Sequence, residues 1–289
     1  MARVDVRKTW KLYIGGAFPR SESGHTYEVA DSSGKFVANA ALASRKDVRD
    51  AVVAARKAFG SWSGRTAYNR AQILYRIAEV MEDRRPQFEE CVKQSEGGTA
   101  AAARRQVDDA IDRLVWYAGW ADKLAQVIGN ANPVAGPFFN HTAPEPTGVV
   151  GVLAPQGSSL LGLVSTIAPV VVTGNTAVVV SSYSRPLPAV TFAEVLATSD
   201  VPGGVINILT GDAVALGPWL AAHMDTLGRF LERYLESHVH EETSLAYWQT
   251  DFAIGVDNDP SVYYRPARST ASIYLNSLLY RELLAFGSL

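Results

Sequence analysis

Apolar residues recur every three or four positions as far as residue 127, which is the spacing of amphipathic helices. One such stripe consists of Ile73, Leu74, Ile77, Ala78 and Met81. The pattern predicts four helices, over about 47–59, 67–81, 87–95 and 100–127. Ser44 is placed to cap the first of them. Ahead of these helices, the alternation over Trp10–Ile14 predicts a short strand that turns at Gly15-Gly16.

The pattern changes between residues 148 and 223, where short apolar runs alternate with helical stretches. Strands are predicted at 148–153, 177–180 and 205–209, and helices at 158–172, 187–197 and 213–223. Because a helix with short connections separates each strand from the next, the sheet is expected to be parallel and wound in the right-handed sense. The fold class is therefore α/β, with N-terminal helices followed by a Rossmann-like parallel sheet. No GxGxxG follows any of these strands, so the usual dinucleotide phosphate turn is absent.

Residues 226–289 differ in composition from the rest of the chain. They contain no lysine but six of the twelve tyrosines, and they predict helices over 227–240 and 271–286. We therefore divide the chain into a domain over 1–225 and an atypical helical, tyrosine-rich tail over 226–289. A three-stranded parallel sheet leaves an open edge, and this tail is expected to cover that edge or to contact another subunit.

Composition narrows the function classes. A net charge of −2 favours neither nucleic acid nor an anionic membrane as a partner, and no apolar run is long enough to span a bilayer. The single cysteine excludes internal disulfides and fits a reducing cytosol, and the charged N-terminus does not resemble a signal peptide. We expect a cytoplasmic protein. No metal site is predicted, because His238 and His240 have a spacing that points to different sides of a helix.

Short motifs follow one another in a specific order along the chain. They are Leu12–Gly16, Asp47–Trp62, Glu145–Pro155, Ala168-Pro169, Gly174–Thr176 and Val201–Ile208. In this order and spacing, the stretch from Lys11 to Asp225, about three quarters of the chain, resembles the cofactor-binding part of the aldehyde dehydrogenase superfamily. The resemblance implies that family's fold, NAD or NADP as cofactor, and an oligomerisation hairpin near residues 138–151.

The resemblance also carries a set of cofactor-contact positions onto this chain. They are Leu153, Ala154, Pro155, Gln156, Val180, Tyr183, Ala213 and Gly217. Three of these depart from the family's residue types. The family has a tryptophan at Gln156, and it commonly holds the adenosine ribose or a 2′-phosphate with a lysine and a glutamate at Val180 and Tyr183. Ser181 and Ser182 are the nearest hydroxyls, and we expect them to line or cap a strand end.

The catalytic groups of the family have no counterpart in this chain. Gly157 stands where the family has the asparagine whose amide donates to the developing oxyanion. The family's nucleophile is a cysteine thiolate, and the only cysteine here, Cys91, falls in an acidic helix well before the first predicted strand of the sheet. The nearby Glu89 and Glu90 are expected to raise the pKa of its thiol. No catalytic residue is assigned.

Three functions remain open at this point. The first is a catalytically impaired family member that acts as a structural or non-catalytic partner in a homo- or hetero-oligomer, with an active aldehyde dehydrogenase as the candidate partner. The second is an NAD(P)-dependent oxidoreductase that oxidises an aldehyde to an acid with a thiol from another chain. The third is a nucleotide-binding module without turnover. The segment Gly157-Ser158-Ser159 lacks the GxSxG signature, which argues against hydrolase chemistry there.

Overall fold

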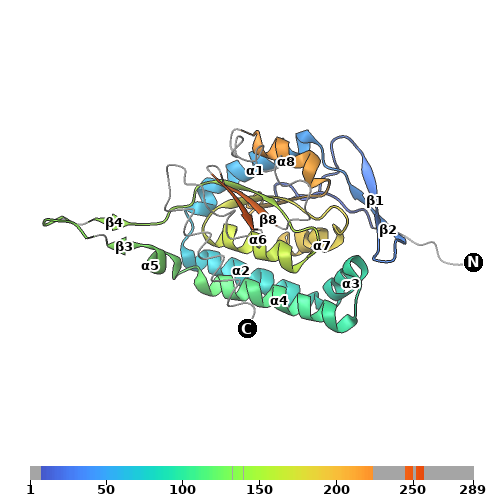
Figure 1. The fold of residues 1–289 in the computed structure, drawn as a ribbon, viewed down its shortest axis with the longest axis horizontal. Coiled ribbons are helices and arrows are strands. Elements are labelled where there is room, and N and C mark those ends of the chain that lie inside the picture. The colour runs from blue at the N-terminus through green and yellow to red at the C-terminus, as the bar shows by residue number, and fades with distance from the viewer. Residues whose placement is uncertain (1–7, 132, 139, 224–244, 250–251, 257–289) are drawn as a thin grey trace, which may run out of the picture.

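A computed structural model describes residues 8–223, apart from 132 and 139, together with residues 245–249 and 252–256. Its centre is a five-stranded sheet in the order β7-β6-β5-β8-β9 (Figure 1). The first three positions are the parallel strands β5 (Val149–Leu153), β6 (Thr176–Val180) and β7 (Ile206–Leu209). Val149 pairs with Thr176, and Ala177 with Ile206. The α/β class and the parallel sheet are as the sequence predicts.

The parallel strands are buried on both faces, which explains why they are continuous apolar runs. Successive residues of these strands point into two different hydrophobic cores, one on each face of the sheet. Val152 and Val179 face α6 (Leu161–Val172) and α7 (Leu187–Leu196), whereas Val178 and Val180 face α1 (Arg45–Ser63) and α8 (Ala213–Ala221). The sheet is therefore the middle layer of three, with helices on either side (Figure 1).

The N-terminal helices form where the apolar spacing places them. Ser44 caps α1 with a full capping box, because its hydroxyl accepts from the N–H of Asp47 and the Asp47 carboxylate accepts from the N–H of Ser44. α2 (Ala67–Asp83) buries all five residues of its predicted stripe. α3 (Arg85–Glu96) and α4 (Ala100–Trp120) follow. The predicted fourth helix ends earlier than expected, because tightened turns at Ala121 and Lys123 separate α4 from the short α5 (Leu124–Ile128).

Residues 8–41 form a small antiparallel hairpin and a segment that joins the central sheet. The hairpin consists of β1 (Thr26–Ala30) and β2 (Phe36–Ala41). The alternation predicts a strand over Trp10–Ile14, but this segment forms only isolated bridges. Tyr13 exchanges two backbone hydrogen bonds with Ile208, of 2.9 and 2.8 Å. This segment is thus held to the outer side of β7.

A two-stranded arm extends away from the body of the molecule (Figure 1). It is made of β3 (Asn130–Ala131) and β4 (His141–Thr142), which pair antiparallel. The arm lies earlier than the range 138–151 given by the resemblance, because residues 149–151 pair along β6 and belong to the central sheet. Only β4 falls within the expected range.

The described part of the tail adds a hairpin to the sheet. β8 (Leu245–Gln249) pairs antiparallel with β5, and β9 (Phe252–Val256) pairs with β8. The tail therefore covers the open edge of β5, as expected, but it does so with strands where a helical tail is predicted. The predicted helices over 227–240 and 271–286 lie outside the described residues, and the division at residue 225 stays a prediction.

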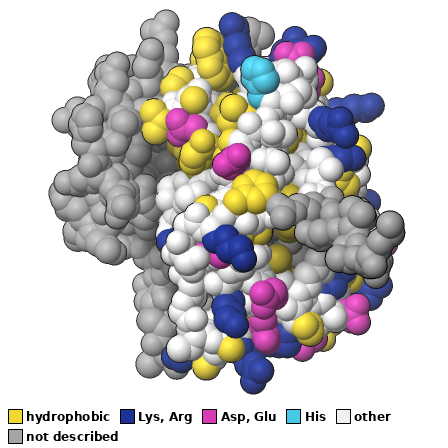
Figure 2. Space-filling model, turned by 90° about the vertical axis from the view of Figure 1, so that its right-hand side faces the viewer, with side chains coloured by type: hydrophobic (Ala, Val, Ile, Leu, Met, Phe, Trp, Pro, Cys, Tyr) yellow, Lys and Arg dark blue, Asp and Glu magenta, His cyan; other side chains and the backbone are white. Residues whose placement is uncertain are grey.

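Surface features add two observations. No helix in the described part of the chain is long and apolar enough to cross a membrane. On the face seen in Figure 2, basic and acidic side chains are interspersed, and neither sign forms a continuous field there.

Candidate functional site

The carboxyl ends of β5 and β6 meet at one edge of the sheet, where α/β proteins commonly bind ligands. Leu153 pairs with Val180, and the N–H of Ala154 donates to the carbonyl of Val180 at 2.9 Å. Both Leu153 and Val180 are buried. The loops that follow the two strands therefore start side by side, and we call their residues 154–159 and 181–185 the strand edge.

Gln156 ties the two loops of the strand edge together. Its amide nitrogen donates to the carbonyl of Ala154 at 3.0 Å, and its amide oxygen accepts from the N–H of Tyr183 at 2.9 Å. The hydroxyl of Ser182 donates to the Gln156 backbone carbonyl at 2.9 Å. Arg185, which the sequence gives no reason to single out, donates to the carbonyl of Gly157 at 2.6 Å. The side chain of Gln156 is thus engaged in holding the loops.

Tyr183 lies against a residue from the far end of the chain. Its ring stacks on that of Tyr27 in β1, with centroids 4.5 Å apart and an angle of 11° between the planes. Burial, and secondarily the neighbouring Tyr183, raise the pKa of Tyr27 well above its usual range. The Tyr27 hydroxyl is buried without a hydrogen-bond partner among the described residues. Tyr27 is a site residue that sequence reasoning misses, because its partner is 156 positions away.

The two serines after β6 have different environments. Ser182 lines the strand end through its bond to Gln156, as expected. The Ser181 hydroxyl is buried and has no hydrogen-bond partner in the part of the chain that the structure describes. The Ser182 side chain is thus held within the strand edge, and the Ser181 side chain is buried beside it.

The remaining two carried-over positions lie on α8, which starts just after β7. Ala213 is half-buried and Gly217 is buried, and α8 packs against β5 and β6. Asp212 caps the helix by accepting from the N–H of Val214 at 3.0 Å. A carboxylate at this end suits the positive end of the helix dipole, but it repels a phosphate brought to the same place.

These side chains can be tested against the cofactor that the resemblance implies. Val180 is fully buried and apolar, and Tyr183 is stacked on Tyr27 with its backbone N–H already bonded to Gln156. Neither side chain offers the charge that the family commonly places beside the adenosine ribose. The strand edge therefore does not fit that contact, and we derive no reaction step through the cofactor.

The single cysteine is remote from this chemistry. Cys91 lies on α3, and its side chain is buried. Its sulfur is 3.5 Å from the hydroxyl of Thr191 on α7, which is not part of the strand edge. Burial raises the pKa of the Cys91 thiol, and this effect outweighs the opposing hydrogen bond from Thr191. The predicted direction is correct, but burial is a larger cause than the charge of Glu90.

The serines that follow β5 have structural partners. The Ser158 hydroxyl accepts from the N–H of Gly162 at 2.9 Å. Ser159 donates from both its hydroxyl and its N–H to one oxygen of Glu96, at 2.6 and 2.7 Å. In the described residues neither serine is bonded to a histidine, so the arrangement does not support a serine nucleophile. Within the same residues no group of three metal-ligating side chains occurs, and His238 and His240 lie outside them.

Sequence comparisons identify relatives of this chain. The Aldehyde dehydrogenase family matches residues 18–227. The chain is 34% identical to cytosolic aldehyde dehydrogenase 1 of Elephantulus edwardii over 230 residues, which are 78% of this chain and 45% of that protein. It is 30% identical to the NADP(+)-dependent D-glyceraldehyde dehydrogenase of Thermoplasma acidophilum over 214 residues, 74% of this chain and 43% of that protein. The chain thus spans less than half the length of these curated relatives.

Solved structures give the same result for the fold. An aldehyde dehydrogenase from Bacillus cereus, in complex with NAD+, has a TM-score of 0.73 and 25% identity, covering 81% of this chain and 50% of that one. A betaine aldehyde dehydrogenase from Staphylococcus aureus, also in complex with NAD+, has a TM-score of 0.71 and 26% identity, covering 75% of this chain and 44% of that one.

Proposed function

Because the chain belongs to the aldehyde dehydrogenase family, we propose that it serves that family as a non-catalytic partner subunit, assembled with an active aldehyde dehydrogenase. One observation carries the proposal. The only thiol in these 289 residues is Cys91, which is buried between α3 and α7 and has a raised pKa. Attack on an aldehyde requires an accessible thiolate, and Cys91 is neither accessible nor easily ionised.

The strand edge supports the same proposal. Gly157 provides no side-chain donor for an oxyanion, and the amide of Gln156 is committed to Ala154 and Tyr183. A missing oxyanion donor, on a sheet and helices that keep the family's arrangement, is the pattern expected when a scaffold serves assembly. The single thiol also suits a reducing compartment such as the cytosol, where we place this partnership.

The β3–β4 arm is the surface that we assign to assembly. Phe138 and Val134, in the loop between its two strands, are 74% and 41% exposed. A partner that covers exposed apolar side chains removes them from water, and this burial stabilises the assembly. The assembly is a homo- or hetero-oligomer, and the partner in the second case is a family member that retains its thiol.

The experiment is co-expression with a tagged, active aldehyde dehydrogenase, followed by size-exclusion chromatography with light scattering. We expect the two chains to elute together, and Phe138→Asp to separate them. Val53→Asp is the matched control, because Val53 is 54% exposed on α1 and away from the arm. A monomer at micromolar concentration that never joins the active enzyme contradicts the proposal.

A second candidate function has its own support. The framework of β5, β6, β7 and their helices is similar to that of the Bacillus cereus enzyme solved with NAD+. On this basis the chain takes part in NAD(P)-dependent oxidation of an aldehyde to an acid, with the thiol supplied by another chain. Aldehyde turnover that survives Cys91→Ala supports this candidate, and turnover lost on that substitution identifies Cys91 as the nucleophile. Saturable NAD or NADP binding without turnover favours a nucleotide-binding module.

A further inference from the structure

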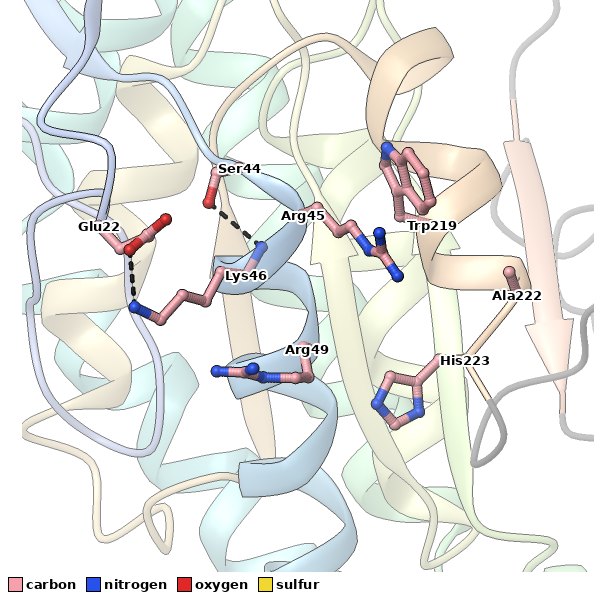
Figure 3. Close-up of a pocket in the computed structure, with 8 residues that line it drawn as sticks. All are labelled: Glu22, Ser44, Arg45, Lys46, Arg49, Trp219, Ala222 and His223. Carbon is pink, nitrogen blue, oxygen red and sulfur yellow. Dashed lines mark hydrogen bonds and ion pairs between the residues drawn. The ribbon is translucent and has the colours of Figure 1, made fainter.

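A pocket of about 700 Å³ lies away from the strand edge, between the first turns of α1 and the last turn of α8 (Figure 3). Its lining residues are Glu22, Ser44, Arg45, Lys46, Arg49, Trp219, Ala222 and His223. None of the carried-over cofactor positions is among them. The volume is in the range of small-molecule sites.

The charge of this pocket is unbalanced. Among the described residues, its lining contains three basic side chains, those of Arg45, Lys46 and Arg49, and one carboxylate, that of Glu22. In Figure 3, Arg45 points towards Trp219, whereas Lys46 and Arg49 point to the side of Glu22. The ammonium of Lys46 is 2.7 Å from Glu22, and Arg49 is 2.8 Å from Asp50, but both pairs are exposed and therefore contribute little. An incoming anion of higher charge density can compete for these cations at small cost.

Arg45 has no carboxylate partner in the described part of the chain. Its guanidinium lies over the ring of Trp219, 4.4 Å from the centroid (Figure 3). This contact with the indole face holds the guanidinium in place and leaves its N–H groups able to donate. The pair is thus arranged before any ligand arrives.

The side chains, and not the helix terminus, make the site. The hydroxyl of Ser44 already accepts from the N–H groups of Lys46 and Asp47, so these donors of the first turn are satisfied within α1. Trp219 is 44% exposed, and with Ala222 it gives the pocket an apolar wall beside its cations.

We propose that this pocket binds a small phosphorylated ligand that carries a planar ring, the chemistry of a nucleoside monophosphate. The phosphate pairs with the guanidinium of Arg45, whose fork matches phosphate oxygens, and the positive charges of Lys46 and Arg49 in the same lining favour a doubly charged group. The ring lies along the apolar wall that Trp219 and Ala222 form.

The test is calorimetric titration of the whole chain with adenosine monophosphate, adenosine and inorganic phosphate. We expect adenosine monophosphate to bind at least tenfold more tightly than either of the other two. Arg45→Ala is expected to weaken its binding at least tenfold, and Arg45→Lys by less. Arg76→Ala is the matched control, because Arg76 is an exposed arginine of α2 paired with Glu79, outside the pocket.

Arg45 is exposed, so its replacement is not expected to disturb folding. No binding of adenosine monophosphate at millimolar concentration overturns the proposal, and so does equal binding by the Arg45→Ala and Arg76→Ala variants. Tyr183→Ala separates this pocket from the strand edge. If that variant loses binding while Arg45→Ala keeps it, the ligand occupies the strand edge and the proposal is wrong, whereas the partner-subunit proposal is unaffected.

Discussion

The side-chain oxygen of Asn207 accepts a hydrogen bond of 2.9 Å from the backbone N–H of Gly15, a residue 192 positions earlier in the chain. The amide nitrogen of Asn207 donates to the carbonyls of Ala177 and Gly204, at 3.2 and 2.8 Å. Asn207 is fully buried, so one side chain satisfies polar groups of the N-terminal segment, of β6 and of the turn before β7. The motif Val201–Ile208, which contributes to the family resemblance, therefore contains a residue that joins three parts of the fold, and we call this contact the junction.

Asn207→Ala is expected to lower the free energy of unfolding by about 2–4 kcal/mol, because it leaves buried polar groups without partners. Urea denaturation followed by circular dichroism measures the change. Asn39→Ala provides the control, since Asn39 is exposed on β2 and its loss is expected to change little. Equal stability of the two variants would show that the junction contributes nothing.

An added methyl group is expected to destabilise the protein at Gly203 but to have little effect at Gly157. A Cβ added at Gly203 would overlap the carbonyl oxygen of Gly15, whereas one added at Gly157 meets nothing within 4 Å. Gly203→Ala should therefore cost about 1–3 kcal/mol of stability through overpacking. Gly157→Ala should change it by less than about 0.5 kcal/mol. Thermal unfolding of both variants checks this, and a stable Gly203→Ala protein would contradict the close approach.

Tyr27→Phe is expected to leave the protein as stable as before, or up to about 1 kcal/mol more stable, because it removes a buried hydroxyl that has no partner within the described residues. The stack on Tyr183 is retained by a phenyl ring. Tyr27→Ala removes the ring as well and should destabilise. Chemical denaturation of the two variants, with Tyr68→Phe on the surface of α2 as control, makes the comparison. A marked loss of stability in Tyr27→Phe would reveal a partner for the hydroxyl.

The thiol of Cys91 is expected to react slowly with a disulfide reagent at pH 8 in the folded protein and rapidly in urea. Its pKa is raised by burial, so the folded state keeps the proton longer than the unfolded state does. The resulting stability is present below the unfolded pKa of about 8.5 and is lost as the pH rises towards the folded pKa.

Cys91→Ala should therefore weaken the decline of stability between pH 8 and 10, which unfolding measured across that range reports. Rapid labelling of the folded wild-type protein would mean that the thiol is accessible.

Local patterns predict most of the helices and parallel strands of this fold. The stripe on α2 is buried as the 3.6-residue period requires, and β5, β6 and β7 are recognised as uninterrupted apolar runs. The break between α4 and α5 is missed, because apolar residues continue through it while the backbone tightens at Ala121 and Lys123. Two-residue strands such as β3 are too short to leave a periodic pattern.

Contacts between distant residues account for the rest. The resemblance points to Gln156, Val180 and Tyr183, but the sequence holds no sign that Gln156 bridges two loops or that Tyr183 stacks on Tyr27. The pairing of β8 with β5 is likewise non-local, and only the need to cover a sheet edge could suggest it. The Arg45–Trp219 pair joins α1 to α8 across 174 positions and gives no local signal.

The pairing of Tyr13 with Ile208 has a consequence for the order in which the protein can be built. A ribosome adds about 5–20 residues per second, so the N-terminal segment emerges about 10–40 s before the strand that receives it. During that interval the backbone groups that Tyr13 later pairs with Ile208 have no native partner from the sheet. The segment around Tyr13 is thus synthesised well before the strand that fixes it, and a chaperone that shields nascent chains can act on it during that interval.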